Sequence, residues 1–365
     1  MYSRRELLAG AAGLIGLGVV VVAAERASPL HRTIDGAGRL APPEIVPLAS
    51  LSGRRLSARL VKLSPRQRAR FPAGTFGDPD FVDPSNYPVY MTYSSSAGGW
   101  VGAGIDRTVI AMPAYTSAQG ARVPAQATGD TNQFTLVRVD GSASVSGLTL
   151  LGTPQGHLYN GLQIFRGDRA RITDVRIKGI PGDNGAPPGE TFSLNNYRST
   201  DTTITGLEVD GTDSSGTPVA ASGIGNNYCS GLAVNDSYLH DCAYGAGITE
   251  YECTGRFVYT RVRSVGNVVG FNFEQFSAGS ITLVGCESAG NRWDMVVDSN
   301  LGSTKILIED PVLPADRPFT VLVDKYYDYP PKPPGQQSPN QQLVSDITLT
   351  RDGVARPDLL DVVVR

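Results

Sequence analysis

Short stretches in which every second position is hydrophobic recur along the central part of the chain in two interleaved series. Successive members of each series lie 23 to 32 residues apart. The stretches of the first series begin at Leu162, Phe192, Ile224, Ile248, Phe271, Met295 and Val321. Those of the second series begin at Val145, Ile172, Ile204, Val234, Val258, Ile281 and Ile306. Alternation with a period of two is the pattern of a β-strand, and repeats of this length are typical of solenoids. The two series therefore predict a solenoid in which each turn of chain places one strand on each of two faces.

Three long insertions interrupt the early turns, at residues 152–160, 179–190 and 210–222. Each insertion precedes a strand of the first series, so all three are expected to project from the same edge of the solenoid. Insertions that gather on one side of a repeat protein commonly form the wall of a binding cleft. A binding cleft is therefore expected beside the strands of the first series.

The composition agrees with an all-β chain. Glycine occurs 42 times and proline 25 times, and only 18% of residues are charged, which favours many turns over long helices. The formal net charge is −3, and the repeat region has no cluster of lysine or arginine next to aromatic residues. Nucleic acid is therefore not expected as a partner.

The two ends of the chain differ from the repeats. Arg4 and Arg5 precede an apolar run over residues 7–24, which is similar to a twin-arginine export signal. Residues 1–30 are thus expected to direct secretion, either cleaved or kept as a membrane anchor. We expect a lead-in or cap over residues 31–94, the solenoid over 95–325, a proline-rich linker over 326–342 and a strand cap over 343–365.

Four cysteines lie in the repeat region, and no pair has the C-x-x-C spacing of a metal site. Cys229 and Cys253 occupy equivalent places in successive turns. Because neighbouring strands lie about 4.8 Å apart, the two residues can form either a disulfide or a stack of buried thiols. The sequence leaves both open and predicts no metal centre.

The segments at residues 157–162, 187–192 and 270–274 carry a family resemblance. Over residues 95–325 the chain resembles the pectate-lyase-like superfamily, and especially β-helix proteins of actinobacteria and their phages. The resemblance implies a single-stranded, right-handed parallel β-helix that is glycan-active or tail-associated, and monomeric or homotrimeric. The polygalacturonase motifs Asn-Thr-Asp, Gly-Asp-Asp and Gly-His-Gly are absent from the sequence, so the resemblance implies no particular chemistry.

Outward positions along the first series form columns, because side chains alternate between the two sides of a strand. One column is rich in polar groups: Phe165, Asn195, Asn227, Tyr251, Glu274, Asp298 and Asp324. Glu274 and Asp298 fall on neighbouring rungs, so their carboxyls are expected about 5 Å apart, the spacing used by retaining glycosidases. A solvated acidic edge, or a row of turn-forming side chains, is the alternative interpretation.

Further candidates surround this column. Glu250 falls at an inward position, where an unpaired carboxylate costs several kcal/mol, so it needs a hydrogen-bonding network or a catalytic role. It is the second candidate for a catalytic acid. The candidate substrate-binding residues, which offer amide, carboxylate, imidazole or aromatic groups to a sugar, are Asn195, Asn227, Tyr251, Asn272, His157, Tyr159 and Glu190.

Three functions remain open on these grounds. The leading prediction is a secreted glycoside hydrolase that uses Glu274 with Asp298 or Glu250. A polysaccharide lyase is the second, in which the same acids would hold Ca²⁺; otherwise no cofactor is expected. A non-catalytic glycan-binding or adhesive solenoid is the third.

Overall fold

The computed structural model describes residues 44–48, 62–76, 91–95, 98–111, 135–152, 160–180, 191–220, 222–242, 245–276, 278–300, 304–314, 317–324, 326–327, 338–339 and 342–365. The predicted export segment over residues 1–30 lies outside these ranges, as do His157, Tyr159 and Glu190. Within the described residues, no helix has the length and apolar character needed to cross a membrane.

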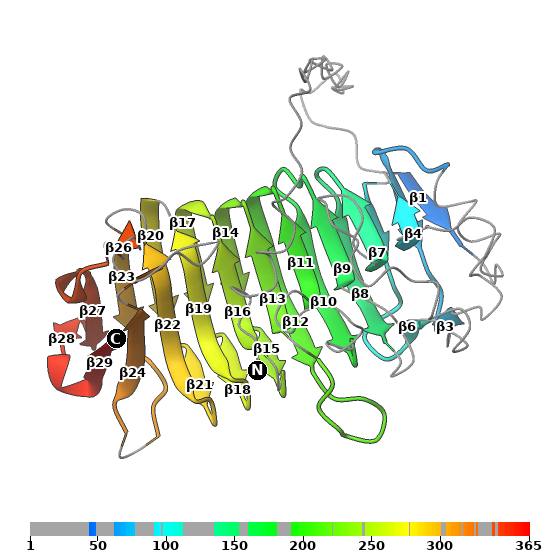
Figure 1. Ribbon diagram of the computed structural model, residues 1–365. Coiled ribbons are helices and arrows are strands. Elements are labelled where there is room, and N and C mark those ends of the chain that lie inside the picture. The colour runs from blue at the N-terminus through cyan, green and yellow to red at the C-terminus, as the bar shows by residue number, and fades with distance from the viewer. Residues whose placement is uncertain are drawn as a thin grey trace, which may run out of the picture.

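The described chain is a parallel β-solenoid whose rungs stack side by side along one axis (Figure 1). One side, here called face A, is a ten-stranded sheet. Its strands, in spatial order, are β4 (Met91–Ser95), β7 (Thr135–Asp140), β9 (Asn160–Phe165), β11 (Phe192–Tyr197), β13 (Ser222–Asn227), β16 (Ala246–Tyr251), β19 (Val269–Phe276), β22 (Trp293–Asn300), β24 (Phe319–Asp324) and β29 (Leu360–Val364). Spatial order follows chain order along the whole sheet, as one strand per turn requires.

The remaining strands form a second sheet that is bent into two faces. Face B contains β1 (Glu44–Pro47), β2 (Gln67–Arg70), β5 (Gly99–Val101), the first halves of β8 (Ser144–Leu151), β10 (Arg171–Lys178) and β12 (Thr200–Asp210), and then β14 (Ser230–Asn235), β17 (Thr254–Thr260), β20 (Ala278–Val284), β23 (Thr304–Glu309) and β27 (Ile347–Arg351). Face C contains β3 (Gly74–Phe76), β6 (Thr108–Ala111), the second halves of β8, β10 and β12, and then β15 (Tyr238–His240), β18 (Arg263–Val265) and β21 (Glu287–Ala289). The solenoid thus has three faces, and the prediction of two was wrong.

One residue per turn bends the second sheet. These corner residues have left-handed backbone with φ between 47° and 65°, and they are Gly147, Asp174, Gly206, Asp236, Arg261, Gly285 and Asp310. A single left-handed residue turns the strand direction sharply, and Gly, Asp and Asn adopt this conformation most readily. Hydrophobic alternation continues on both sides of the corner, so the sequence pattern resembled one strand.

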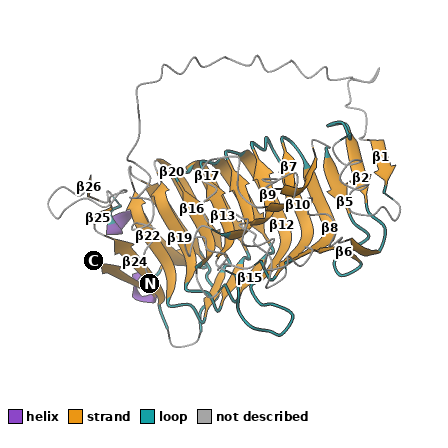
Figure 2. Ribbon diagram, turned by 45° about the vertical axis from the view of Figure 1, so that its right-hand side comes forward, coloured by secondary structure: helices purple, strands orange, loops and turns teal. Residues whose placement is uncertain are grey.

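The C-terminal region continues both sheets of the solenoid. β27 pairs in parallel with β23, and β29 pairs in parallel with β24, so together they add one more rung. A short β28 (Val354–Ala355) pairs antiparallel with β27. In the stretch predicted as a linker, β25 (Tyr326–Tyr327) pairs antiparallel with β26 (Ser338–Pro339). Figure 2 shows strands throughout, and the only helices of the described residues are the 3₁₀ turns Val344–Asp346 and Pro357–Leu359.

The interior of face A is an apolar column with one residue per rung. Its members are fully buried: Val137, Leu162, Leu194, Ile224, Ile248, Phe271, Met295 and Val321. The sequence had placed Phe192 beside Leu162, whereas Leu194 is the residue that pairs with it. A shift of two residues keeps every side chain on the same side of the strand, so hydrophobic alternation cannot detect it.

A polar ladder runs through the same interior. Asn196 donates from Nδ2 to Oδ1 of Asn226 at 3.0 Å, and Asn226 donates from Nδ2 to Oε1 of Glu250 at 2.9 Å. The Tyr259 hydroxyl donates to the same Glu250 oxygen. Glu250 therefore has the hydrogen-bonding network that its inward position requires.

The four cysteines are free and buried. The Cys229 backbone N–H lies 3.4 Å from Sγ of Cys253, and each of these two thiols donates to a backbone carbonyl of the preceding rung, at 3.2 and 3.3 Å. The thiol stack is therefore the arrangement present, and no disulfide joins the two residues.

Candidate functional site

The outer side of face A carries a continuous row of side chains at or near the end of each strand, before the corner with face B. The row, here called the outer row, is Asp140, Phe165, Tyr197, Asn227, Tyr251, Glu274, Asp298 and Asp324, each paired with the next across neighbouring strands. Tyr197 occupies the place that the sequence had given to Asn195, because of the two-residue shift in β11. Asn195 instead pairs with Gln163 and Gly225, one outward position earlier.

Acidic residues occupy the C-terminal half of the outer row. Glu274 on β19 is the direct partner of Asp298 on β22, which in turn is the partner of Asp324 on β24. The predicted adjacency of Glu274 and Asp298 is therefore confirmed, and parallel strands bring such partners to about 4.8 Å. Asn272 donates from Nδ2 to Oε1 of Glu274 at 2.8 Å and so orients that carboxylate. All three acids are half-buried.

Aromatic residues occupy the N-terminal half of the row. The rings of Phe165 and Tyr197 are parallel, with centroids 5.7 Å apart. The Tyr197 ring meets Tyr228 edge to face at 5.6 Å, and Tyr228 meets Tyr251 in the same way at 5.6 Å. Tyr228 stands at the corner beside the row with a left-handed φ of 58° and is 40% exposed. It is the ring of this group most open to a ligand.

Arginines lie over the same rings. The Arg166 guanidinium lies 5.0 Å from the Phe165 ring centre, and that of Arg198 lies 5.3 Å from the Tyr197 ring centre. Both arginines are exposed corner residues with φ of 51°, one rung apart. Cation–π contact places each guanidinium beside an aromatic ring at the surface of the solenoid. The outer row therefore runs from a cationic, aromatic end to an acidic end.

Two amide residues of the predicted site, Asn195 and Asn227, are buried. Asn227 donates from Nδ2 to Oδ1 of Asn195 at 2.9 Å, and the two residues are 6% and 1% exposed. Gln163 and Thr249, at the same outward positions as Asn195, are also buried. Asn195 and Asn227 therefore bond to each other beneath the surface rather than standing in the open.

Glu250 lies on the other side of the sheet from the acidic pair. It pairs with Phe273 in the interior, whereas its neighbour Tyr251 pairs with Glu274 on the outer row. Its side chain is fully buried, and burial raises the pKa of its carboxyl well above the ordinary value. A polysaccharide cannot reach it, so the catalytic assignment of Glu250 was wrong.

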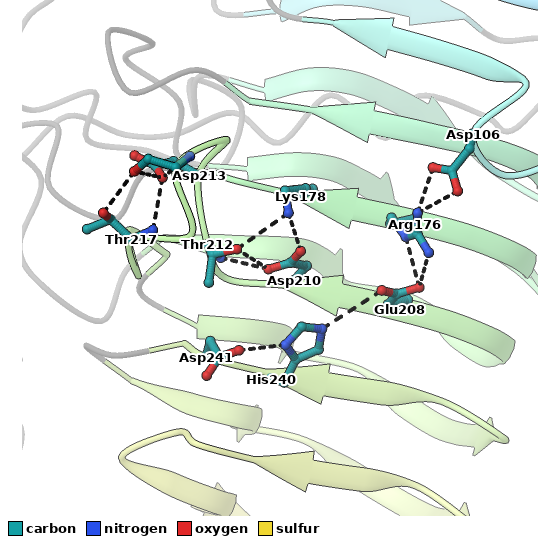
Figure 3. A network of polar contacts seen from close by, with 11 residues as sticks. Asp106, Arg176, Lys178, Glu208, Asp210, Thr212, Asp213, Thr217, His240 and Asp241 are labelled. Carbon is teal, nitrogen blue, oxygen red and sulfur yellow. Dashed lines mark hydrogen bonds and ion pairs between the residues drawn. The ribbon is translucent and has the colours of Figure 1, made fainter.

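A second cluster of polar side chains lies on the outer surface of face C and was missed from the sequence (Figure 3). Lys178, Asp210 and His240 end three successive strands and lie side by side. Lys178 Nζ contacts Oδ2 of Asp210 at 2.5 Å. Reading the outward positions of the second series would have found these residues, since each of the three ends its strand at such a position.

The cluster extends to neighbouring side chains through ion pairs. Arg176 lies between Asp106, at 2.6 Å, and Glu208, at 2.8 Å. His240 Nδ1 lies 2.7 Å from Oδ2 of Asp241, and its Nε2 lies 3.9 Å from Oε1 of Glu208. These contacts join Asp106, on the turn before β6, to Asp241, directly after β15, across the whole of face C (Figure 3).

Asp210 is the best-ordered carboxylate of the cluster. Burial alone would raise its pKa, but hydrogen bonds from Lys178 and Thr212 outweigh burial and hold the pKa of Asp210 below its ordinary value. The Thr212 backbone N–H and hydroxyl both reach Oδ1, at 2.9 and 2.6 Å. Asp210 is thus ionised and fixed in direction.

No protein-family model matches the chain, and no curated protein matches it. The chain is similar to three kinds of solved structure. An alginate lyase from Paenibacillus sp. str. FPU-7 is 15% identical, with 87% of this chain and 97% of that one covered and a TM-score of 0.42.

The catalytic domain of a GH87 α-1,3-glucanase in complex with nigerose is 9% identical, with 88% of this chain covered and a TM-score of 0.40; this chain spans 66% of that domain. The A-module of the Azotobacter vinelandii mannuronan C-5 epimerase AlgE4 is 14% identical, with coverages of 89% and 93% and a TM-score of 0.36. The strand pairing of the chain itself defines its architecture, which is a right-handed parallel β-solenoid.

Proposed function

We propose that the protein is an exported polysaccharide-degrading enzyme that binds its substrate along the outer row and hydrolyses it with Glu274 and Asp298. The observation that carries the proposal is the direct pairing of these two acids on neighbouring rungs, on the same edge of face A as the exposed side chains of Tyr228, Arg166 and Arg198. A polysaccharide is a linear ligand, and a linear row of groups on a solenoid matches its shape. Solved structures of similar overall course include a glucanase, a lyase and epimerases.

The two carboxyls have separate roles in the proposed reaction. Glu274, whose Oε1 is oriented by Asn272, attacks the anomeric carbon and forms a glycosyl–enzyme ester. Asp298 gives its proton to the leaving oxygen as the glycosidic bond breaks. Asp298 then removes a proton from water, which displaces Glu274 and releases the sugar. The pairing of Glu274 with Asp298 on strands that lie about 4.8 Å apart supports this retaining course, which needs carboxyls about 5–5.5 Å apart, over an inverting one.

The aromatic half of the row would hold the chain of sugars away from the cleavage point. Tyr228 and Tyr251 offer rings against which the apolar face of a pyranose can pack. Loss of such a ring lowers binding of the remote part of the substrate, which reduces the rate as well as the affinity when that binding helps to position the bond.

A lyase acting on an acidic polysaccharide is the second candidate. The exposed guanidinium groups of Arg166 and Arg198 favour it, because planar guanidinium donors suit carboxylate and sulfate groups. In this case Glu274 and Asp298 would be oxygen ligands for Ca²⁺. Products of a lyase absorb in the ultraviolet through a new double bond, and a chelator would stop their formation, so one assay separates the two reactions.

The deciding experiment compares Glu274→Gln and Asp298→Asn with Glu309→Gln. Glu309 is a matched control because it is a half-buried carboxylate on the outside of face B. Release of reducing ends is measured on a panel of neutral and acidic polysaccharides. Loss of either acid should reduce the rate by at least about 100-fold, the ordinary contribution of acid–base catalysis, while the control keeps full activity. Full activity in both variants would remove this pair from the mechanism.

Retention without cleavage has a separate readout. If no polysaccharide is cleaved but several slow the protein in affinity gels, the protein binds glycans and does not degrade them. In that outcome a Tyr228→Ala variant should migrate freely, whereas Glu274→Gln should still be retarded.

A further inference from the structure

The polar cluster on face C carries an excess of negative charge. Four carboxylates, those of Asp106, Glu208, Asp210 and Asp241, face two cations, those of Arg176 and Lys178, which leaves a net charge of −2 with the histidine neutral. The cluster is partly shielded from water: the Asp210 and His240 side chains are only 13% and 14% exposed. A divalent cation would balance this charge.

Three side chains of the cluster converge on one point. Asp210, His240 and Asp241 each offer a ligand atom, and these atoms all lie within 4.8 Å of one another (Figure 3). They come from two adjacent rungs, since Asp210 and His240 are direct partners at the ends of β12 and β15. An imidazole nitrogen with two carboxylate oxygens is a ligand set used by transition metals, and a fourth position is left for water.

Each of the three groups is held in place by a contact that leaves a lone pair available. The Asp210 carboxylate is oriented through Oδ1 by Thr212. The His240 ring stacks on Tyr238 at a centroid distance of 4.3 Å and an interplanar angle of 19°. Asp241 stands at the left-handed corner after β15, with φ of 58°.

The second ring nitrogen of His240, Nε2, provides a further observation in favour of a metal site. Nε2 is buried and makes no hydrogen bond within the described part of the chain, and its nearest charged group is Oε1 of Glu208 at 3.9 Å. When Nδ1 of a histidine binds a metal, Nε2 carries the proton and commonly donates it to a carboxylate. Glu208 is the carboxylate on this side of the ring, and a small side-chain movement would bring it within hydrogen-bond distance of Nε2.

We infer that Asp210, His240 and Asp241 form a binding site for one divalent transition-metal ion of the zinc type. The ion takes Nδ1 of His240, an oxygen of Asp241 and Oδ2 of Asp210. The proton shared by His240 and Asp241 leaves to solvent, and the Lys178 ammonium leaves Oδ2. Lys178 thus competes with the metal ion for Oδ2 of Asp210, with which it forms an ion pair when no metal is bound. Ca²⁺ and Mg²⁺ fit poorly, because they prefer oxygen-only ligand sets.

This site is separate from the outer row and does not depend on the proposed glycan activity. Asp210 begins the connection to β13, which projects as a loop from the solenoid (Figure 1). A metal bridging Asp210 and Asp241 would tie the ends of β12 and β15 together at the base of that loop. Binding of an ion to the folded state alone stabilises it in proportion to the logarithm of ion concentration.

The test uses the full-length protein without a histidine tag, freed of metal by a chelator. Calorimetric titration with ZnCl₂ should show one saturable site, and the melting temperature should rise with Zn²⁺ but not with Ca²⁺ or Mg²⁺. His240→Gln and Asp241→Asn should each weaken Zn²⁺ binding by more than about tenfold, given that loss of a mere supporting residue already costs 10- to 100-fold. Lys178→Met should tighten it.

Asp236→Asn is the matched control, because Asp236 is another corner carboxylate that pairs with an arginine, Arg261. It should bind Zn²⁺ as the unmodified protein does. Absorption of a Co²⁺ complex provides a second readout on the unmodified protein, since tetrahedral Co²⁺ with a nitrogen ligand has strong visible bands. Absence of saturable Zn²⁺ binding, unchanged affinity in His240→Gln, or absence of these Co²⁺ bands would each overturn the assignment.

Discussion

Replacing Glu250 by glutamine is expected to make the protein more stable at neutral pH and to change how stability depends on pH. The side chain is fully buried, with Oε1 accepting hydrogen bonds from Asn226 and Tyr259. Its second oxygen, Oε2, has no hydrogen-bond partner within the described residues. Burial in this interior raises the pKa of Glu250 well above its ordinary value, despite those hydrogen bonds.

The direction in which stability changes with pH follows from the protonation of Glu250 in the folded and in the unfolded chain. Below a pH of about 4.3, the ordinary pKa of glutamate, the carboxyl is protonated in both the folded and the unfolded chain and causes no difference. As the pH rises above that value, the unfolded chain loses the proton and is stabilised, while the folded chain keeps it. Stability therefore falls with rising pH until the folded-state pKa is reached, and it is constant above it.

The magnitude has an upper limit at pH 7. Each pH unit between the ordinary pKa and the folded-state pKa costs about 1.4 kcal/mol. A carboxyl that stays fully protonated in the folded state sets the upper limit, and at pH 7 this limit is about 3–4 kcal/mol. Glutamine has no charged form, so a glutamine at this position causes no loss of stability as the pH rises. Its buried amide adds a constant penalty of about 1–3 kcal/mol if unpaired, so the change with pH is the diagnostic quantity.

The assay is urea unfolding of the unmodified protein, Glu250→Gln and Ile248→Val between pH 4 and pH 7.5. Ile248 lies on the same strand and in the same interior, and its shortening costs about 0.5–1.5 kcal/mol at every pH. The stability of Glu250→Gln relative to the unmodified protein should rise by up to about 3 kcal/mol from pH 4 to pH 7. A difference that stays constant over this range, as expected for Ile248→Val, would refute the buried, protonated state of Glu250.

Three further predictions concern the scaffold. Asp294→Ala should destabilise the fold by about 2–3 kcal/mol in the same unfolding assay, because it removes the fully buried partner of Arg317, 2.7 Å away; an unchanged midpoint would show that the pair is not needed. Gly279→Ala should cost at least about 1–3 kcal/mol, because φ is +126° and the added Cβ would collide with a carbonyl oxygen of the neighbouring rung. Gly285→Ala, where the nearest atom is 3.6 Å from the added Cβ, should cost less than Gly279→Ala, and the reverse order would contradict the steric argument. All four cysteines should resist an aromatic disulfide reagent until the chain unfolds, because burial removes access and raises the pKa of the Cys286 thiol to about 12; rapid labelling of the native protein would exclude the buried thiol stack.

The acidic pair could be predicted from the sequence because the turns that contain β16, β19, β22 and β24 are nearly equal in length. Phe271 and Met295 mark the same interior position, so the residues three places on, Glu274 and Asp298, must be neighbours. The position of Tyr197 could not be predicted in the same way. Phe192 and Leu194 are both apolar and two residues apart, and either one could have entered the interior column.

The cluster on face C was hidden for a different reason. Lys178, Asp210 and His240 are 32 and 30 residues apart, and none belongs to a motif that is local in sequence. Their proximity depends on the register of the second sheet and on the left-handed corners that separate face B from face C. Each corner is set by a single residue such as Asp174, which lengthens the spacing between buried residues from two to three, as between Ile172 and Val175. Outward positions before and after a corner therefore do not belong to one continuous alternation.

The sequence by itself determined the solenoid, the inward direction of Glu250 and the adjacency of Glu274 and Asp298, because hydrophobic alternation and a regular repeat are properties of the chain that folding preserves. The tertiary structure alone decided the number of faces, the register of β11 and the meeting of Asp210, His240 and Asp241. The physical reason is that alternation specifies on which side of a strand a residue lies. Backbone corners and hydrogen-bond register determine which residues of other turns lie beside it.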